Sequence, residues 1–361
     1  MDVHIVPGVK ATDVAQAHRM DVLIQNEHQC KCMTYWIDEE RETIFCLIEA
    51  PTKEAVSEMH GRAHGLIPNK IIEVNSNLVG SFLGRIYDPI DADMTDGLKI
   101  FKDPSFRTLL LIKTPDRALV KYRFGTEKAE ELLESSYAIT RRNVAKNEGR
   151  EVEAKNRCFI ASFVSAASAV ACAVEIQKEL PEEVAELDGV KIAINAGEPV
   201  ANSNDLFGDT IQLAHYMCNV SKNFHIALSS SVNELISSVS VRDRENKIIA
   251  LSPREEEVLC CLFRILEENW QDADFNVSQC CSSMAMSKSH LYRKTMAVCG
   301  LSPVSLLKNF RLEKALELMR KQRYNISEIT FASGFNSPSY FTKCFKKRYG
   351  LLPMTYVDLL H

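Results

Sequence analysis

The stretches SKSHLYRK at 287–294 and SPSYFTKCFKK at 337–347 decide the fold of the C-terminal region, because the second repeats the pattern of the first fifty residues later. Each begins with a serine and continues with aromatic or histidine, apolar and basic residues in similar order. The repeat extends further, since Gly-Leu-Ser-Pro at 300–303 recurs as Gly-Leu-Leu-Pro at 350–353. The region is therefore an internal duplication of about fifty residues.

Each copy predicts a helix-turn-helix. Short helices are expected at 277–284 and 326–333, and second helices at 287–298 and 337–348. Ser287 and Ser337 are placed as N-caps of the second helices, and Gly334 supplies a turn where positive φ costs least. Between the copies, apolar residues recur at helical spacing over 303–321, which predicts a connecting helix whose apolar stripe faces both units.

The second helix of each unit is expected to turn one face to the core and the other outward. The residues expected to point to the core are Leu291 with Met296, and Phe341 with Phe345. The outward faces carry Ser289, Tyr292 and Arg293 in the first unit, and Pro338, Ser339, Thr342 and Lys343 in the second. Two such helices on a rigid connector can enter major-groove segments of double-stranded DNA about 34 Å apart.

The charge distribution favours a polyanionic partner for this region. The chain carries a net charge of −5, yet thirteen Lys and Arg stand against three acids between Lys288 and Arg348. A basic module on an otherwise acidic protein is typical of nucleic-acid binding. Within it, Arg293 is expected to contact a base edge and Lys347 a phosphate. A merely solvated basic helix face is the alternative, and the duplication with its two caps argues against it.

The sequence HLYRK…GLSP…RLEKALELM…ISEI…GF.SPSYFTKCFKKRYGLLP closely resembles the DNA-binding domain of the AraC/XylS transcription regulators, over about 270–358. The resemblance implies sequence-specific binding of duplex DNA through the second helix of each unit. Base contacts carried over by position fall on Ser289, Tyr292, Arg293, Pro338, Ser339 and Lys343. Family members often have long side chains where this chain has Ser289, Pro338 and Ser339, so direct readout is expected to lean on Arg293 and Lys343.

From residue 107 the pattern changes to alternating strands and helices, which predicts an α/β or α+β layer. The order of ELLESSYAITRRNVAKNEGREVE, FIASF, VKIAINAGEPV and FGDTIQLAHYM resembles class III adenylyl/guanylyl cyclase domains over about 107–236. A domain of that shape normally pairs with a second copy, so the resemblance implies a homodimer through this region.

The residues that a cyclase needs are replaced at the matching positions. Two carboxylates must hold the metal ions of such an enzyme, but the matching residues are Lys113 and Arg157. The late Asn and Arg of the family correspond to Gln212 and Tyr216. Asp116 lies near but has no second carboxylate, so we expect no catalytic residues and no enzyme activity. The vacant cleft is expected either to bind a nucleotide-like ligand or to serve only as a dimerisation scaffold.

The first 75 residues read strand, helix, hairpin, helix, strand, which predicts a ferredoxin-like fold. His60 and His64 are four apart on the second helix, so both imidazoles lie on one face, at a spacing that can chelate a metal or simply be a satisfied pair. The stretches VKATDVAQAHRMD, YWIDEERETIFCLIEAP and HGRAHGLIPNKIIEV resemble a small bacterial nickel-binding family. The expected ligands are His60 and His64, then His18 and Cys32. The resemblance indicates nickel, whereas the residue types also suit another divalent transition metal.

The expected fold class is multidomain: a ferredoxin-like α+β domain, an α/β cyclase-like domain and an all-α double helix-turn-helix. The expected boundaries are 1–75 for the first domain, 76–104 for a linker, 105–238 for the second domain, 239–252 for another linker, and 253–361 for the DNA-binding domain. A cytoplasmic location is expected, because no signal peptide or membrane span is evident and twelve cysteines form no disulfide framework. The chain is thus read as a cytoplasmic transcription regulator; a cyclase controlled by metal or DNA, and a metal-buffering protein, are the rivals.

Overall fold

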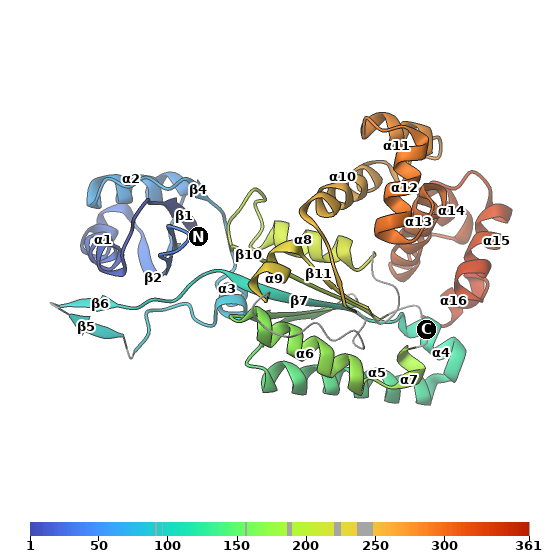
Figure 1. Ribbon diagram of the computed structural model, residues 1–361, viewed down its shortest axis with the longest axis horizontal. Helices are drawn as coiled ribbons and strands as arrows, with labels where there is room; N and C mark the ends of the chain where they lie inside the picture. The colour runs from blue at the N-terminus through green and yellow to red at the C-terminus, as the bar shows by residue number, and fades with distance from the viewer. Residues whose placement is uncertain are drawn as a thin grey trace.

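The computed structural model describes residues 1–90, 92–95, 97–155, 157–185, 190–219, 225–236 and 248–360. In Figure 1 the chain forms a small N-terminal sheet with two helices, a larger central sheet with helices on both faces, and an all-helical C-terminal region. The multidomain fold class expected from the sequence is thereby confirmed.

The N-terminal sheet has the strand order β2-β3-β1-β4. Its strands are β1 (Asp2–Ile5), β2 (Lys31–Asp38), β3 (Thr43–Glu49) and β4 (Lys70–Ile71). Helices α1 (Ala11–Ile24) and α2 (Lys53–Ala63) follow β1 and β3, with a short 3-10 turn η1 (Gln25–His28) after α1. This order is that of a ferredoxin-like fold, and β1 is the central strand that brings Asp2 and His4 beside both helices.

The segment expected to link the first two domains is folded against them. It contains α3 (Ser76–Leu83) and a hairpin of β5 (Asp93–Thr95) and β6 (Leu98–Ile100). The rings of Tyr35 and Phe101 stack at 4.1 Å, which joins the end of the segment to the N-terminal sheet. On the other side, Phe82 of α3 lies 4.8 Å from Phe207 of the central domain. The segment is therefore an ordered spacer between the two sheets.

The central sheet has the strand order β12-β11-β10-β7-β9-β8. Its strands are β7 (Arg107–Lys113), β8 (Arg150–Lys155), β9 (Cys158–Phe163), β10 (Lys191–Gly197), β11 (Ile226–Leu228) and β12 (Ile248–Ala250). The four strands β10-β7-β9-β8 repeat the ferredoxin-like order of the first domain, and two parallel strands extend the sheet beyond β10.

Alternating residues of β7 face the two sides of this sheet. Leu110 and Ile112 join the core beneath it, whereas Leu109 and Leu111 join the core above it. In Figure 1, α5 and α6 cover one face, and α3 and α8 lie on the other. The helices of this domain are α4 (Arg117–Phe124), α5 (Thr126–Lys146), α6 (Ala166–Glu179), α7 (Glu182–Ala185), α8 (Gly208–Met217) and α9 (Ser230–Leu235).

The linker expected at 239–252 differs from the structure at its C-terminal end; its residues 239–247 lie outside the described residues. Ile248–Ala250 form β12, which pairs in parallel with β11. The next residue continues this pairing, because Leu251 N donates to Leu228 O at 2.9 Å. Ser252 then caps helix α10. The helical region thus begins directly at the edge of the central sheet.

The C-terminal region contains the duplicated helix-turn-helix predicted from the sequence. Its helices are α10 (Pro253–Asn269), α11 (Val277–Ser283), α12 (Lys288–Cys299), α13 (Pro303–Arg320), α14 (Ile326–Ala332), α15 (Pro338–Tyr349) and α16 (Pro353–Asp358). The Ser287 and Ser337 side chains accept hydrogen bonds from His290 N and Tyr340 N, as expected for N-caps. The connecting helix α13 buries Leu312 and Leu316 against the core of the second unit.

Gly334 is required where the turn of the second unit meets α10. Its φ is +76°, and an added Cβ would lie 2.2 Å from the carbonyl oxygen of Trp270. We expect Gly334→Ala to destabilise the protein by about 2 kcal/mol more than Gly350→Ala, because a backbone clash must be relieved. Gly350 is the matched control, since its φ is +84° but nothing lies within 4 Å of its Cβ position. Urea denaturation followed by tryptophan fluorescence measures both; equal losses would refute the close-packing argument.

Candidate functional site

A group of histidine and aspartate side chains meets in the interior of the N-terminal domain. The donor groups form two sets, and within each set the donor atoms lie within 4.8 Å of one another; both sets include His60. The first set comprises Asp2, His4, Cys46 and His60; the second comprises Asp21, His60 and His64. The register of the sheet places Asp2 opposite Cys46. His4 also lies on β1, while α1 supplies Asp21 and α2 with its C-cap supplies His60 and His64. His60 is the residue that joins the two sets.

His60 lies between two buried carboxylates. Its Nδ1 is 3.0 Å from Asp21 Oδ1, and its Nε2 is 3.3 Å from Asp2 Oδ2. Burial disfavours the imidazolium, but the hydrogen bonds and charges of Asp2 and Asp21 outweigh it and raise the pKa of His60 to about 9. Burial likewise opposes the Asp2 carboxylate, yet His4 and His60 hold its pKa well below the usual range. The cluster is therefore built to stabilise positive charge between its two aspartates.

The donors of this cluster fit a divalent transition metal. Imidazole nitrogen and carboxylate oxygen are common ligands of such ions. His64 Nε2 lies 3.1 Å from His60 Nδ1, so the two histidines expected to chelate are adjacent. In addition, His4 Nδ1 is buried and has no hydrogen-bond partner among the described residues. Asp21, His60 and His64 would hold the ion, with Asp2 and His4 beside it. Burial and Asp2 raise the pKa of the Cys46 thiol, which makes Cys46 a poorer ligand.

The other two expected metal ligands lie outside both donor sets. His18 Nε2 is 3.6 Å from Asp88 Oδ2, and its ring packs 5.2 Å from Tyr35. Cys32 Sγ is 3.8 Å from Met59 Sδ, and burial together with Asp21 raises the pKa of the Cys32 thiol. The sequence did carry a signal for the residues that were missed: Asp2 and His4 alternate on one face of β1, and Asp21 lies on the same face of α1 as Val14.

The two second helices of the C-terminal region expose the residues expected to bind DNA. Ser289, Tyr292 and Arg293 are exposed on α12. On α15, Pro338, Ser339, Lys343 and Lys347 are exposed and Thr342 is half-buried. The opposite face of α15 buries Phe341 and Phe345, as expected. Met296 was expected in the core with Leu291 but is 40% exposed; Thr295 and Val298 fill that side of α12 instead, because they lie four and seven residues after Leu291.

The positions that match cyclase residues lie at the junction with the helical region. Lys113 Nζ contacts Glu313 Oε2 of α13 at 2.5 Å. Lys113 outweighs the effect of burial and lowers the pKa of Glu313 to about 2. Arg157 Nε donates to Thr114 O at 3.0 Å. A cavity of about 490 Å³ is lined by Lys113, Gln212 and Tyr216 on one side and by Phe263 and Glu313 on the other. The helical region of the same chain thus forms one wall of this cavity.

Both ends of the chain match known protein families. A family profile described as a helix-turn-helix domain matches residues 280–358. The C-terminal region is an AraC-type helix-turn-helix domain. A second profile, described as nickel responsive protein SCO4226-like, matches residues 1–74. This match agrees with the family that the N-terminal sequence resembles.

Individual relatives match this chain over part of their length. Histidine kinase P4 of Formosa agariphila is 32% identical over 108 residues, which cover 30% of this chain and 8% of that protein. The HTH-type transcriptional regulator MtrA of Neisseria gonorrhoeae is 30% identical over 83 residues, or 23% of this chain and 28% of that protein. The chain therefore spans less than a third of the length of either relative.

Among solved structures, an adenylate/guanylate cyclase/hydrolase from Silicibacter pomeroyi is 20% identical to this chain. The match covers 38% of this chain and 83% of the chain in that structure, with a TM-score of 0.32. Among the described residues, no helix is both long and apolar enough to span a membrane.

Metal binding is expected to depend on His60 and His64 and not on His18. The double change His60→Ala/His64→Ala removes two donors and should weaken binding of Ni²⁺ at least about 100-fold, since even residues that only orient ligands contribute about 10- to 100-fold. The matched control is His18→Ala, because His18 pairs with Asp88 outside the donor sets. Equilibrium dialysis against Ni²⁺, Zn²⁺ and Cu²⁺ measures all three proteins. Unchanged affinity in the double variant would exclude this site.

Proposed function

We propose that this protein is a sequence-specific, DNA-binding transcription regulator whose N-terminal domain binds a divalent transition metal ion and transmits its presence to the AraC-type domain. The observation that carries the proposal is the pair of exposed second helices, α12 and α15, held on one connecting helix. Both present Arg or Lys beside small or aromatic side chains, a surface suited to base edges and phosphates. The partner that fits this arrangement is double-stranded DNA, with the two helices in its major groove.

The connecting helix holds the first unit firmly. The guanidinium of Arg311 donates to three backbone carbonyls at the C-cap of the lead-in helix α10 and in the segment that follows it. Nε reaches Trp270 O at 3.0 Å, while a terminal nitrogen reaches Asp272 O at 2.6 Å and Phe275 O at 3.1 Å. These bonds satisfy carbonyls that have no helical partner. The first unit therefore has one fixed orientation on α13, as recognition of two successive groove segments requires.

The N-terminal cluster supports the proposed metal-binding role. Asp2 and Asp21 are almost fully buried, and buried carboxylates require a cation or several hydrogen-bond donors. A divalent ion would supply that charge when bound. Nickel is the metal that the family match favours. The donor set of imidazole and carboxylate also accommodates Zn²⁺ or Cu²⁺, and the dialysis described above distinguishes them.

The central domain is proposed to be a non-enzymatic part of the regulator. A nucleotide cyclase would need carboxylates where this chain has Lys113 and Arg157, and cations repel Mg²⁺. Lys113 is also occupied by Glu313 of the helical region. Homodimerisation through this domain stays a prediction. A cytoplasmic location is part of the proposal, since none of the twelve cysteines, all of which lie within the described residues, forms a disulfide.

The two basic side chains Arg293 and Lys347 are expected to play different roles in DNA binding. Arg293→Ala should cost about 1 to 3 kcal/mol on the preferred duplex and relax specificity at one base. Lys347→Ala should weaken binding to all sequences and reduce the salt dependence, because it removes a phosphate contact. The affinity of the full chain for a selected duplex and for unrelated DNA, measured at several salt concentrations, tests both. Equal losses on every sequence for both variants would contradict these roles.

The chain is expected to form no cyclic nucleotide. Incubation with ATP or GTP and Mn²⁺, followed by chromatography, should give no cyclic AMP or cyclic GMP, because no pair of carboxylates stands at the matching positions. Asp116→Asn serves as a control for a displaced ligand. Cyclic product that disappears in this variant would show that Asp116 has taken over the missing role, and the non-enzymatic reading would be wrong.

A further inference from the structure

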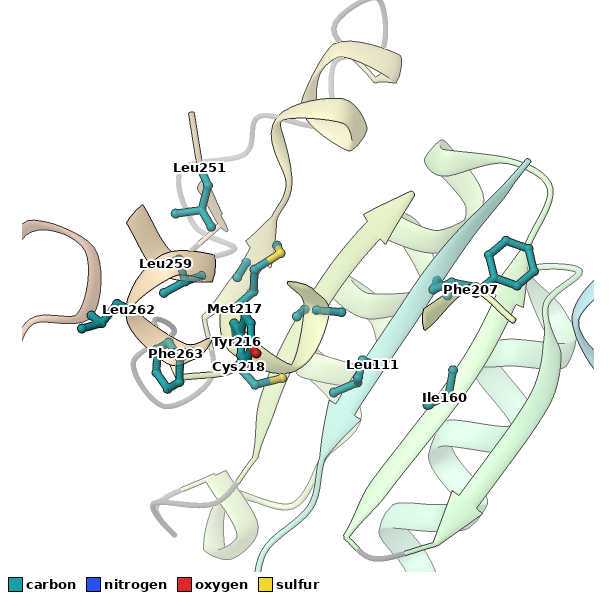
Figure 2. Close-up of a cluster of buried hydrophobic side chains, with 14 of the residues drawn as sticks. Leu111, Ile160, Phe207, Tyr216, Met217, Cys218, Leu251, Leu259, Leu262 and Phe263 are labelled. Atoms are coloured by element: carbon teal, nitrogen blue, oxygen red, sulfur yellow. The ribbon is translucent and has the colours of Figure 1, made fainter. Parts of the chain in front are cut away.

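The central domain contacts both helix-turn-helix units, at two separate places. The first contact joins α8 to α10, the lead-in helix of the first unit. The rings of Tyr216 and Phe263 stack at 5.1 Å, and Tyr216 Oη donates to Glu267 Oε2 at 2.7 Å. Figure 2 shows Tyr216 and Met217 beside Phe263 and Leu259, within one buried cluster that continues to Leu111 and Ile160 of the sheet.

The second contact joins the C-terminal end of β7 and the start of α4 to the second unit. Asp116 is 2% exposed, and its carboxylate caps α4 by accepting from Ala118 N at 3.0 Å. The same carboxylate accepts from Arg320 Nε of α13 at 3.2 Å and from Tyr356 Oη of α16 at 3.0 Å. Burial opposes ionisation, but Arg320 and Arg157 lower the pKa of Asp116. The Lys113–Glu313 pair lies at the same junction.

Tyr356 connects Asp116 to the second recognition helix. Its ring is fully buried and meets the ring of Phe345 of α15 edge-on at 5.9 Å. Ala118 of α4 belongs to the same apolar cluster as Phe341 and Phe345. The position of α15 is therefore fixed by the central domain as well as by α13. Neither contact covers the outward faces of α12 and α15, because Arg293 and Lys343 remain exposed.

The segment that connects the central sheet to the helical region is short. Leu251 is hydrogen-bonded to Leu228 of β11, and α10 begins two residues later. The first unit is thus attached by the backbone and by α8, and the second by Asp116 and Lys113. Because the central domain contacts the two units at different points, it restricts their separation and relative rotation.

We propose that the central domain sets the spacing of the two recognition helices for binding of two adjacent half-sites on duplex DNA, with Asp116 and the Lys113–Glu313 pair as positioning residues for α15. This inference rests on the proposed DNA-binding function and adds to it a role for the central domain. It requires that loosening the second contact weakens binding where both half-sites must be engaged together. Binding that uses the first unit alone should be unaffected.

The test uses the full chain and two duplexes. Selection from a random library by the unaltered protein supplies a duplex with both half-sites, and scrambling the half-site read by α15 supplies the second. Tyr356→Phe removes only the hydroxyl that donates to Asp116, and Asp116→Asn removes the charge while keeping the shape. We expect each variant to bind the two-site duplex about tenfold more weakly than the unaltered protein does, a change within the usual range of coupling between sites. The affinity for the single-site duplex should be the same as that of the unaltered protein.

Matched variants control for folding and for charge. Glu151→Gln breaks an exposed pair with Arg141, elsewhere on the same domain, and should leave both affinities unchanged. Lys113→Glu and Glu313→Lys should each weaken two-site binding, and the double exchange should restore it because the pair is re-formed with reversed signs. Hydrogen exchange of the α15 amides should rise in Tyr356→Phe, Asp116→Asn and the two single charge variants, and should not change in Glu151→Gln.

The outcomes separate this inference from the proposed function. If the unaltered protein prefers no sequence, DNA-binding specificity itself is refuted and the spacing role falls with it. If it selects a two-site duplex but the variants bind both duplexes like the unaltered protein, only the spacing role is refuted. Equal losses on both duplexes would indicate a general structural effect. Tighter two-site binding by the variants would mean that the central domain holds α15 away from the DNA. Equal losses on both duplexes and tighter two-site binding would each overturn the proposal.

Discussion

The need to offset the charge of one buried carboxylate constrains how the central domain and the helical C-terminal region of this protein pack together. An ionised Asp116, just beyond the C-terminal end of β7, is shielded from water, and the free energy of burying its charge must be offset by nearby donors. Its own helix supplies backbone N–H groups, but Arg320 and Tyr356 come from the helical region. Separating the two regions would leave the charge without these partners. The docking of the AraC-type domain is therefore tied to an electrostatic requirement of the central domain.

The same principle operates at the other end of the chain with a different outcome. Asp2 and Asp21 are buried around His60, whose protonation offsets part of their charge. A divalent cation bound there would take over this role and compete with the proton on His60. Because His60 belongs to both donor sets, a change of charge in one set affects the other. The cluster joins β1, α1 and α2, so its charge state bears on the packing of all three elements.

Local signals predicted much of the fold, and residues brought together by topology were the main omission. Helices α12 and α15 could be predicted because Ser287 and Ser337 cap them and apolar residues recur with helical period. β12 was read as linker because three residues, Ile248–Ala250, carry too little pattern to separate a short edge strand from a loop. The pairing with β11 that makes it a strand lies about twenty residues away in sequence. His60 and His64 could be found because they share one helix, whereas Asp2 and Asp21 join them only through the strand order of the sheet. Lys113 and Arg157 were predicted from the resemblance to stand where a cyclase has carboxylates, but no local feature pointed to Glu313 as the partner of Lys113.

The direct passage from β12 through Leu251 into α10 has a consequence for how such a gene can be recombined. A helical DNA-reading cassette with a loose tether could be moved between sensors by cutting anywhere in the tether. Here the last strand of the central sheet leads into the first helix of the C-terminal region through Leu251 and Ser252, and Leu251 is packed in the apolar cluster that spans both. A chimera joined at this point would have to inherit the sheet edge along with the helical region, or supply an equivalent one. Exchange of parts in this architecture therefore favours transfer of the central sheet and the helical region as a single block.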